Sequence, residues 1–275
     1  MICFPNIKIN LGLHVINRRT DGFHNIETVF YPVKLADVLE IIEAETRTEQ
    51  ITFTSSGLPI DGNAADNLIV KAYQLLHQDF QLPKVQVHLH KIIPMGAGLG
   101  GGSSNAAYMI TLLNQKFNLK LSSERMESYA AQLGSDCAFF ISNKPAYVYG
   151  KGYELEPIEI SLNEYYLVLL NTGLHSSTAL AYQHVRRREV LDVKDSLKEN
   201  IKCPVSQWKE CMENDFEYSV FQALPLLKEI KNDLYDSGAV YASMSGSGAA
   251  MFALYTKKPQ LPEKLRPYVC FEGLL

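Results

Sequence analysis

The sequence predicts an α+β protein with two domains. Segments with the apolar patterns of strands are mixed with segments of helical periodicity, without the strict βαβ alternation of a doubly wound parallel sheet. The chain has 275 residues, 47% of them hydrophobic, which is enough for one large or two ordinary domains with their own cores. We place a boundary near Gly150–Gly152, which gives domains 1–150 and 151–275.

The first 150 residues contain both kinds of pattern. Short β-branched segments separated by turn residues such as Arg18–Gly22 predict strands, and apolar and polar residues alternate in Lys84–Lys91. Apolar residues at helical spacing follow a possible N-cap, Asp66 or Asn67. The predicted strands are Ile7–Ile9, Val29–Val33, Val38–Ile42 and Lys84–Lys91, and the predicted helices are Asp66–Phe80, Ser104–Phe117 and Ser122–Leu133.

The second part of the chain continues this mixture. The uninterrupted apolar run Tyr165–Leu170 is typical of a buried strand. The further predicted strands are Tyr147–Gly152 with its turn, Val240–Met244 and Ala249–Tyr255, and the further predicted helices are Ser177–Glu189, Val205–Lys209 and Ala223–Tyr235.

Composition and charge exclude several classes of protein. The balance of 26 Lys+Arg against 30 Asp+Glu gives a net charge of −4, and the sequence has no acidic or basic tail. We therefore expect neither a nucleic acid nor an anionic membrane as partner. The five cysteines lack C-x-x-C spacing, and the N-terminus lacks the pattern of a signal peptide. We therefore expect a reduced, cytoplasmic protein that holds any anionic ligand locally.

A glycine-rich loop lies between a predicted strand and a predicted helix. Five of the seven residues from Gly96 to Gly102 are glycines, a density that is costly in ordered backbone unless close approach or positive φ angles require it. Exposed N–H groups and the positive end of the following helix would bind phosphate, whereas the alternative is a tight strand-to-helix connection. The candidate phosphate-binding residues are Pro94, Met95, Gly96, Ala97, Gly98, Leu99, Gly100, Gly101, Gly102, Ser103 and Ser104.

Two known glycine motifs fit this loop incompletely. A P-loop is excluded, because Gly102 occupies the position where that motif requires lysine. The spacing Gly96-x-Gly98-x-x-Gly101 matches the dinucleotide-binding fingerprint, but the expected acidic residue would be Glu124 or Glu127, and both lie in a predicted helix. A dinucleotide-dependent oxidoreductase is therefore the weaker alternative.

Two charged residues and a second glycine cluster add to the loop. Asp136 lies among small and apolar residues, so it needs a cation or a catalytic role, unless it is only a helix N-cap. Lys8 shares one face of a predicted strand with Asn6 or Asn10, and its alternative is an ordinary exposed strand residue. The cluster Ser243–Ala250 is either a hairpin turn or, paired with the first loop, the second wall of a site.

Three segments, Pro5–Leu11, Pro94–Ala107 and Ser243–Ala250, resemble the three motifs of the GHMP small-molecule kinases in order. Further segments are similar to the branch of that family whose acceptor is a cytidine-diphosphate-linked methylerythritol. These segments are Arg19–Phe30, Asp66–Ile69 and Gly134–Asp136. The resemblance implies a two-domain α+β fold with the active site in the cleft between the domains.

The same resemblance implies an activity and the residues that perform it. It implies ATP-dependent phosphorylation of the acceptor's 2-hydroxyl, a step of the non-mevalonate isoprenoid route. It also implies a Mg²⁺ ion, for which the sequence offers one ligand, Ser103 or Ser104, and leaves the others undetermined. Lys8 and Asp136 would be the catalytic pair, and Gly96–Ser104 the phosphate loop. The residues implied in acceptor binding are Phe23, His24 and Tyr182 for the cytosine, and Asn10, Ser245 and Gly246 for the phosphates or polyol.

The chain departs from this family's pattern at two places, where Cys137-Ala138 replaces Val-Pro and Phe23 replaces a tyrosine. Three classes of function remain distinct. A small-molecule kinase accounts for all three motifs, with homoserine or mevalonate kinases as the alternative within the family. A dinucleotide-dependent oxidoreductase accounts for the first loop alone, and a non-catalytic nucleotide-binding protein leaves Lys8 and Asp136 unexplained.

Overall fold

The computed structural model describes residues 1–44, 49–183, 185 and 196–275. The chain forms two compact units, and each is built from several stretches of sequence. The first unit contains Met1–Ile7, Lys34–Met95 and Gly100–Lys144, and the second contains Lys8–Val33, Gly96–Leu99 and Pro145–Leu275. Both units combine helices with a sheet, which confirms the α+β class.

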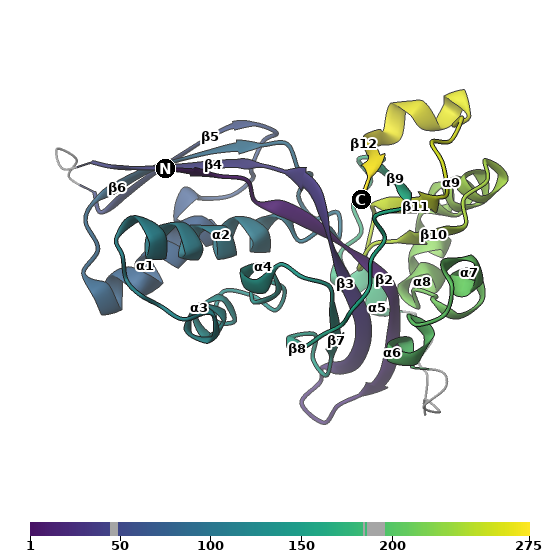
Figure 1. The fold of residues 1–275 in the computed structure, drawn as a ribbon, viewed down its shortest axis with the longest axis horizontal. Coiled ribbons are helices and arrows are strands. Elements are labelled where there is room, and N and C mark those ends of the chain that lie inside the picture. The colour runs from purple at the N-terminus through teal and green to yellow at the C-terminus, as the bar shows by residue number, and fades with distance from the viewer. Residues whose placement is uncertain (45–48, 184, 186–195) are drawn as a thin grey trace. The chain divides into compact units, whose positions relative to one another are not determined.

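The first unit has one sheet covered by helices. The strands, in the order in which they pair, are β1 (Ile2–Cys3), β4 (Val38–Glu43), β6 (Val85–Lys91) and β5 (Ile51–Gly57), and only β5 and β6 are parallel. Figure 1 shows two helices side by side along one face of this sheet, with the shorter helices beyond them. The helical segments are η1 (Ala64–Asp66), α1 (Leu68–Phe80), α2 (Gly101–Lys116), α3 (Ser123–Ala130) and α4 (Phe139–Ser142).

Local sequence explains where α1 begins and which face it buries. Asn67 is its N-cap, and the side-chain oxygen of Asn67 accepts a hydrogen bond from the N–H of Ile69 at 2.9 Å. Residues at helical spacing, among them Ile69, Ala72 and Leu76, are fully buried. The capping and the apolar stripe together hold α1 against its neighbours, as the sequence predicts.

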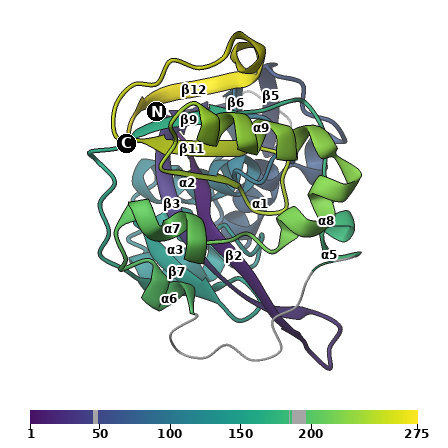
Figure 2. The ribbon, with the colours of Figure 1, turned by 90° about the vertical axis from the view of Figure 1, so that its right-hand side faces the viewer.

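The second unit has two sheets. One has the order β2 (Asn6–Arg18), β3 (His24–Ala36), β7 (Ala146–Tyr149) and β8 (Glu154–Pro157), and the other β10 (Tyr241–Met244), β11 (Met251–Tyr255), β9 (Tyr166–Leu170) and β12 (Val269–Leu274). In Figure 2, α9 lies along the second of these sheets, where its apolar residues join the core cluster that contains Met251 and Ala253. The helical segments are α5 (Thr178–Gln183), α6 (Leu197–Asn200), η3 (Val205–Gln207), α7 (Trp208–Cys211), α8 (Phe216–Ala223), α9 (Pro225–Asp236) and η4 (Glu263–Tyr268).

The predicted elements are present, and the differences have physical causes. The N-terminal strands β2 and β3 are much longer than predicted, because buried residues continue along most of their length and include polar side chains such as that of Glu27. Of the predicted helix Ser177–Glu189, α5 forms the first part, and residues 184 and 186–189 lie outside the described residues. No helix in the described parts of the chain is both long and apolar enough to cross a membrane.

The compact units cross the predicted boundary near residue 150. Residues Lys8–Val33 belong with the C-terminal part of the chain, because β3 pairs with β7 and β7 pairs with β8. The division into domains 1–150 and 151–275 is a division of sequence and stays a prediction.

Glu27 ties several elements of the second unit together. Its carboxylate, in β3, is almost completely buried and accepts hydrogen bonds from His14 Nδ1 (3.0 Å) and the Tyr147 hydroxyl (2.6 Å). The carboxylate also accepts hydrogen bonds from two groups at the start of α6, the Ser196 hydroxyl (2.9 Å) and the Leu197 N–H (3.0 Å). Burial alone would raise the pKa of Glu27, but these four hydrogen bonds outweigh it and hold the pKa below its usual value of 4.5.

Replacing Glu27 should make this link measurable. We expect Glu27→Gln to lower the free energy of unfolding by about 2 kcal/mol at pH 7, since charge-assisted hydrogen bonds are lost. A carboxyl whose folded pKa is depressed stabilises above its unfolded pKa, and that stabilisation is lost as the pH falls through the folded pKa. The difference between wild type and variant should therefore shrink below the usual pKa of 4.5 in denaturant titrations at several pH values.

An exposed carboxylate of the same sheet provides the control. Glu156 in β8 pairs with Lys198 at 2.7 Å but is 45% exposed, so Glu156→Gln should change stability by no more than about 0.5 kcal/mol. A difference between Glu27→Gln and wild type that does not vary with pH would contradict the proposed role of the carboxylate.

Candidate active site

Three glycines give the loop before α2 its shape. Gly96, Gly98 and Gly100 have φ angles of +64°, +78° and +71°, a region that residues with a side chain rarely adopt. Gly100 is also the N-cap of α2, so the loop leads directly to the first N–H groups of that helix. Left-handed residues in alternation and a helix N-terminus are the features that bind anions through the backbone.

Gly101 and Gly102 do not shape the loop through their φ angles as the three preceding glycines do. Gly101 and Gly102 are already in α2, and neither has a positive φ. A Cβ atom at Gly101 would lie 2.8 Å from Ile93 Cγ2 and 3.2 Å from Lys91 Nζ. Gly101 is therefore required by close packing rather than by backbone conformation.

The second glycine cluster lies against Gly98. A Cβ atom at Gly98 would collide with the carbonyl oxygen of Ser245, and the Ser245 hydroxyl donates a hydrogen bond to the Gly98 carbonyl at 2.9 Å. The N–H of Ala250 donates to the Ala97 carbonyl at 3.2 Å. The cluster also connects the antiparallel strands β10 and β11, so it is both a hairpin turn and a wall beside the loop.

Lys8 is buried beside these two backbones. Its side chain lies in β2, and the residue is only 3% exposed, so the alternative of an exposed strand residue is wrong. Nζ donates to Asn10 Oδ1 at 2.7 Å and to the Gly98 carbonyl at 3.1 Å, and it lies 4.4 Å from the centre of the Phe30 ring. An ammonium group is therefore held at the glycine loop.

Asn10 completes this group of predicted residues. Its Oδ1 also accepts a hydrogen bond from the Ser245 hydroxyl at 3.3 Å, and a Cβ atom at Gly246 would lie 3.4 Å from it. The structure thus brings Lys8, Asn10, Ser245 and Gly246 together within the second unit.

Asp136 lies in the first unit, in the turn that precedes α4. The N-cap of α4 is Ala138, so the interpretation of Asp136 as a helix cap is wrong. The Ser135 hydroxyl donates to Asp136 Oδ1 at 3.3 Å. Because Lys8 belongs to the other unit, the pairing of Lys8 with Asp136 stays a prediction.

The turn that carries Asp136 adjoins the start of α2. A Cβ atom at Gly134 would lie 3.3 Å from Cys137 Sγ and 4.0 Å from Ser103 Oγ. Cys137 is fully buried, and burial raises the pKa of its thiol to about 11. The structure therefore brings the predicted loop serine and the Asp136 turn to one place within the first unit.

The predicted cytosine-binding residues are partly gathered. The rings of His24 and Tyr182 stack with their centres 4.6 Å apart, and Tyr182 packs edge-on against Phe216 at 4.8 Å. Phe23 is 61% exposed, and Lys151 Nζ lies 5.0 Å from its ring centre. His24 therefore stacks on Tyr182, and the binding of cytosine by Phe23, His24 and Tyr182 stays a prediction.

Lys151 is a neighbour of Phe23 that sequence reasoning missed. Its ammonium is 2.9 Å from Asp21, and this interaction, together with the Phe23 N–H and Arg19, lowers the pKa of Asp21 to about 2. The Phe23 N–H also donates to Asp21 Oδ1 at 3.2 Å, so Asp21 fixes both the backbone of Phe23 and the cation beside its ring.

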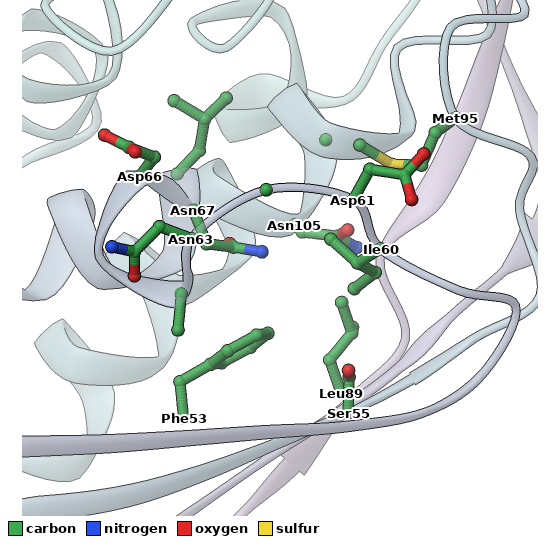
Figure 3. Close-up of a pocket in the computed structure, with 14 residues that line it drawn as sticks. Phe53, Ser55, Ile60, Asp61, Asn63, Asp66, Asn67, Leu89, Met95 and Asn105 are labelled. Carbon is green, nitrogen blue, oxygen red and sulfur yellow. The ribbon is translucent and has the colours of Figure 1, made fainter.

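The first unit also has a pocket of about 300 Å³ that the sequence did not predict. Figure 3 shows Phe53 and Leu89 extending into it from the strands, with Asn63 and Asn67 at one side and Met95 and Asn105 opposite. The complete lining is Phe53, Ser55, Ile60, Asp61, Gly62, Asn63, Ala64, Asp66, Asn67, Leu68, Leu89, Met95, Gly102 and Asn105. The pocket combines apolar walls with amide groups and adjoins the glycine loop through Met95 and Gly102.

Two further residues hold the second glycine cluster and were also missed. Asn214 Nδ2 donates to the carbonyl groups of Met244 (2.8 Å) and Gly246 (2.9 Å). Glu217 in α8 accepts from the Met244 N–H at 2.9 Å and from Lys231 at 2.5 Å. An acidic residue among apolar ones can indicate a buried structural or functional group. Glu217 was missed because it lies in α8, a helix that the sequence did not predict.

Metal ligands are scarce in the described parts of the chain. Among residues 1–44, 49–183, 185 and 196–275, no three His, Cys, Asp or Glu side chains gather into a metal site. Ser104 Oγ is buried in the first turn of α2 and has no hydrogen-bond partner among the described residues. This oxygen fits one ligand of a Mg²⁺ ion, which takes most of its other ligands from phosphates and water.

Comparisons with known families and proteins agree with this geometry. Residues 67–151 match the GHMP kinases N terminal domain, and residues 204–272 match the GHMP kinases C terminal domain. A 4-diphosphocytidyl-2-C-methyl-D-erythritol kinase of Bacteroides fragilis is 51% identical over 95% of this chain and 94% of that protein. Another, of Bacteroides thetaiotaomicron, is 48% identical over the full length of both chains.

Solved structures give the same result. A crystal structure of 4-(cytidine 5'-diphospho)-2C-methyl-D-erythritol kinase has a TM-score of 0.78 and 30% identity, and the match covers 98% of this chain and 96% of that one. The homoserine kinase from Cytophaga hutchinsonii has a TM-score of 0.61 at 17% identity over 92% and 86% of the two chains, a likeness of fold. The chain therefore belongs to the GHMP kinases and, within them, to the family of the 4-diphosphocytidyl-2-C-methyl-D-erythritol kinases.

Proposed function

We propose that this protein transfers the γ-phosphoryl group of ATP to the 2-hydroxyl of 4-(cytidine 5'-diphospho)-2-C-methyl-D-erythritol, in the non-mevalonate route to isoprenoid precursors. The observation that carries the proposal is the buried ammonium of Lys8, 3.1 Å from the Gly98 carbonyl, at the contact between the two glycine clusters. Two relatives that match nearly the full length of the chain, at 51% and 48% identity, bear the name of this kinase.

The residues Pro94–Ser104 and the pocket beside them would bind ATP. The left-handed glycines expose backbone N–H groups, and the N-terminus of α2 adds a partial positive charge for the phosphates. The pocket offers the apolar side chains of Phe53 and Leu89 to a flat base, and amide groups such as that of Asn67 to its polar edge. Because Gly102 lines the pocket, the base would bind beside the N-terminus of α2.

Asp136 would act as the general base and Lys8 as an electrostatic partner. The carboxylate accepts the proton of the attacking hydroxyl, and the ammonium orients the hydroxyl and neutralises charge on the transferring group. Phosphoryl transfer passes through a loose transition state, so positioning and charge stabilisation supply most of the catalysis. Ser104 would hold Mg²⁺, which when bound screens the negative charge of the phosphates.

The acceptor would be recognised through its cytosine, with Phe23, His24 and Tyr182 around the base. Aromatic rings bind a base through its faces, and an imidazole or a backbone group reads its edge. Asn10, Ser245 and Gly246 would contact the phosphates or the polyol, because they lie next to Lys8.

An acceptor profile tests the function directly. We expect ADP release, followed in a coupled assay, with the cytidine-linked acceptor and not with homoserine or mevalonate. Binding of NADH is measured alongside and should be absent. Efficient phosphorylation of homoserine or mevalonate without a response to the cytidine compound would leave only the GHMP family assignment.

Asp136→Asn should lower the turnover number by about 10²-fold or more, because a general base is lost, while ATP binding is retained. Lys8→Met should lower turnover to a comparable extent, since its ammonium contacts the Gly98 carbonyl where the phosphates would bind. Steady-state kinetics and ATP calorimetry on folded variants give the two quantities separately.

The control for these variants is Asp233→Asn in α9. This substitution removes a carboxylate that lies 2.8 Å from Lys264 Nζ. Turnover of this variant should equal that of wild type. Near-normal turnover of Asp136→Asn would remove Asp136 from the mechanism, and a change in the KM for ATP alone would make Lys8 a binding residue.

Phe23→Ala should raise the KM for the cytidine-linked acceptor about tenfold or more, while the KM for ATP stays nearly constant. Tyr182→Ala should do the same and should also reduce thermal stability, because Tyr182 packs on the core residue Phe216. Phe4→Ala is a matched control, since Phe4 is 63% exposed and Phe23 61%. Equal changes in both KM values for Phe23→Ala would show that Phe23 does not recognise the base.

A further inference from the structure

The first unit contains a fully buried ion pair that the proposed reaction does not use. Lys91 ends β6, Asp37 directly precedes β4, and both residues are 0% exposed. Lys91 Nζ lies 2.5 Å from Asp37 Oδ2. Burial lowers the pKa of Lys91, and the charge and hydrogen bond of Asp37 counteract this effect.

Asp37 binds the backbone that leads into the glycine loop. Its Oδ1 accepts hydrogen bonds from the N–H groups of Ile92 (2.8 Å) and Ile93 (2.9 Å), the two residues before Pro94. These two bonds fix the direction in which the chain leaves β6.

The same carboxylate binds the helix on the other side of the loop. Asp37 Oδ2 accepts a hydrogen bond from Asn105 Nδ2 at 2.9 Å, and Asn105 lies in the second turn of α2. Lys91 Nζ lies 3.2 Å from the position that a Cβ atom of Gly101 would take, so the ammonium packs against the first turn. One buried pair therefore contacts the chain on both sides of the loop, before Pro94 and after Gly100.

Stability alone does not account for such a pair. Two charges lose their hydration on burial, and well-packed apolar residues of similar volume often serve as well or better. What an apolar pair cannot supply is a set of directed hydrogen bonds to Ile92, Ile93 and Asn105. The geometry of the loop ends is therefore what the charges provide.

We infer that Asp37 and Lys91 are positioning residues of the ATP site, and that their ion pair fixes the distance and angle between Ile92–Ile93 and the first turns of α2. The inference rests on the proposed function, in which the loop and the N-terminus of α2 bind the phosphates. Backbone N–H groups bind phosphate well only when they are held in place beforehand. Asn105 also lines the adjoining pocket, so the pair influences the base as well as the phosphates.

The test separates ATP binding from acceptor binding. Lys91→Met removes the ammonium and keeps the length of the side chain, and Asp37→Asn keeps an acceptor for Ile92 and Ile93 but places a donor opposite Lys91 and Asn105. Each variant should weaken the Kd for ATP about tenfold or more by calorimetry, and should leave the KM for the acceptor within about twofold of wild type.

Two further variants make the result decisive. Leu76→Ala opens a cavity in α1 of the same unit, so it should lower the melting temperature without weakening the Kd for ATP. Lys91→Arg keeps the charge if Lys91→Met fails to fold, and its larger guanidinium should press on Gly101 and weaken the Kd as well.

The outcomes distinguish this inference from the proposed function. If wild type does not bind ATP, the proposed function fails. If wild type binds ATP and the folded Asp37 and Lys91 variants bind it equally well, the positioning role is wrong. A Kd that weakens in Leu76→Ala in proportion to its lost stability would also overturn the inference.

Discussion

The contact between Gly98 and Ser245 leaves no room for a side chain, and the arrangement of the neighbouring residues depends on it. A Cβ atom at Gly98 would collide with the Ser245 carbonyl oxygen, and the Ser245 hydroxyl donates to the Gly98 carbonyl. That same carbonyl accepts from Lys8 Nζ, so one oxygen joins the glycine loop to the turn and to the cation. With any other residue at position 98, these groups would have to separate, and Lys8 would lose a partner.

Buried carboxylates hold the segments that carry the functional groups. Glu27 binds the start of α6, Asp37 binds the chain beside the glycine loop, and Glu217 binds the strand that leads to Ser245. Burying a charge is costly unless several donors compensate it, and each of these groups has at least three hydrogen bonds. The polar interior is thus concentrated where the backbone must keep an irregular path.

The sequence was sufficient to locate the glycine loop, Lys8 and most of the regular elements. Glycine density, a strand before the loop and a helix after it are local signals, and the structure confirms them. Strand β5 was missed because four of its seven residues are exposed and polar or glycine, so it lacks an alternating pattern. Lys91 and Asp37 were missed because they are 54 residues apart, and each alone resembles an ordinary charged residue at a strand end. Glycine density alone did not distinguish the glycines that need a positive φ from Gly101, where close packing by Ile93 and Lys91 demands glycine.

The burial of Cys137, the residue after Asp136, determines how its thiol reacts with oxidants and alkylating agents. Cys137 is fully buried, and the pKa of its thiol is raised to about 11. A raised pKa leaves little of the reactive thiolate at pH 7, and the sulfur has little access to solvent. Peroxide and alkylating drugs act on exposed thiolates, so oxidative stress and thiol-directed inhibitors would leave this position intact.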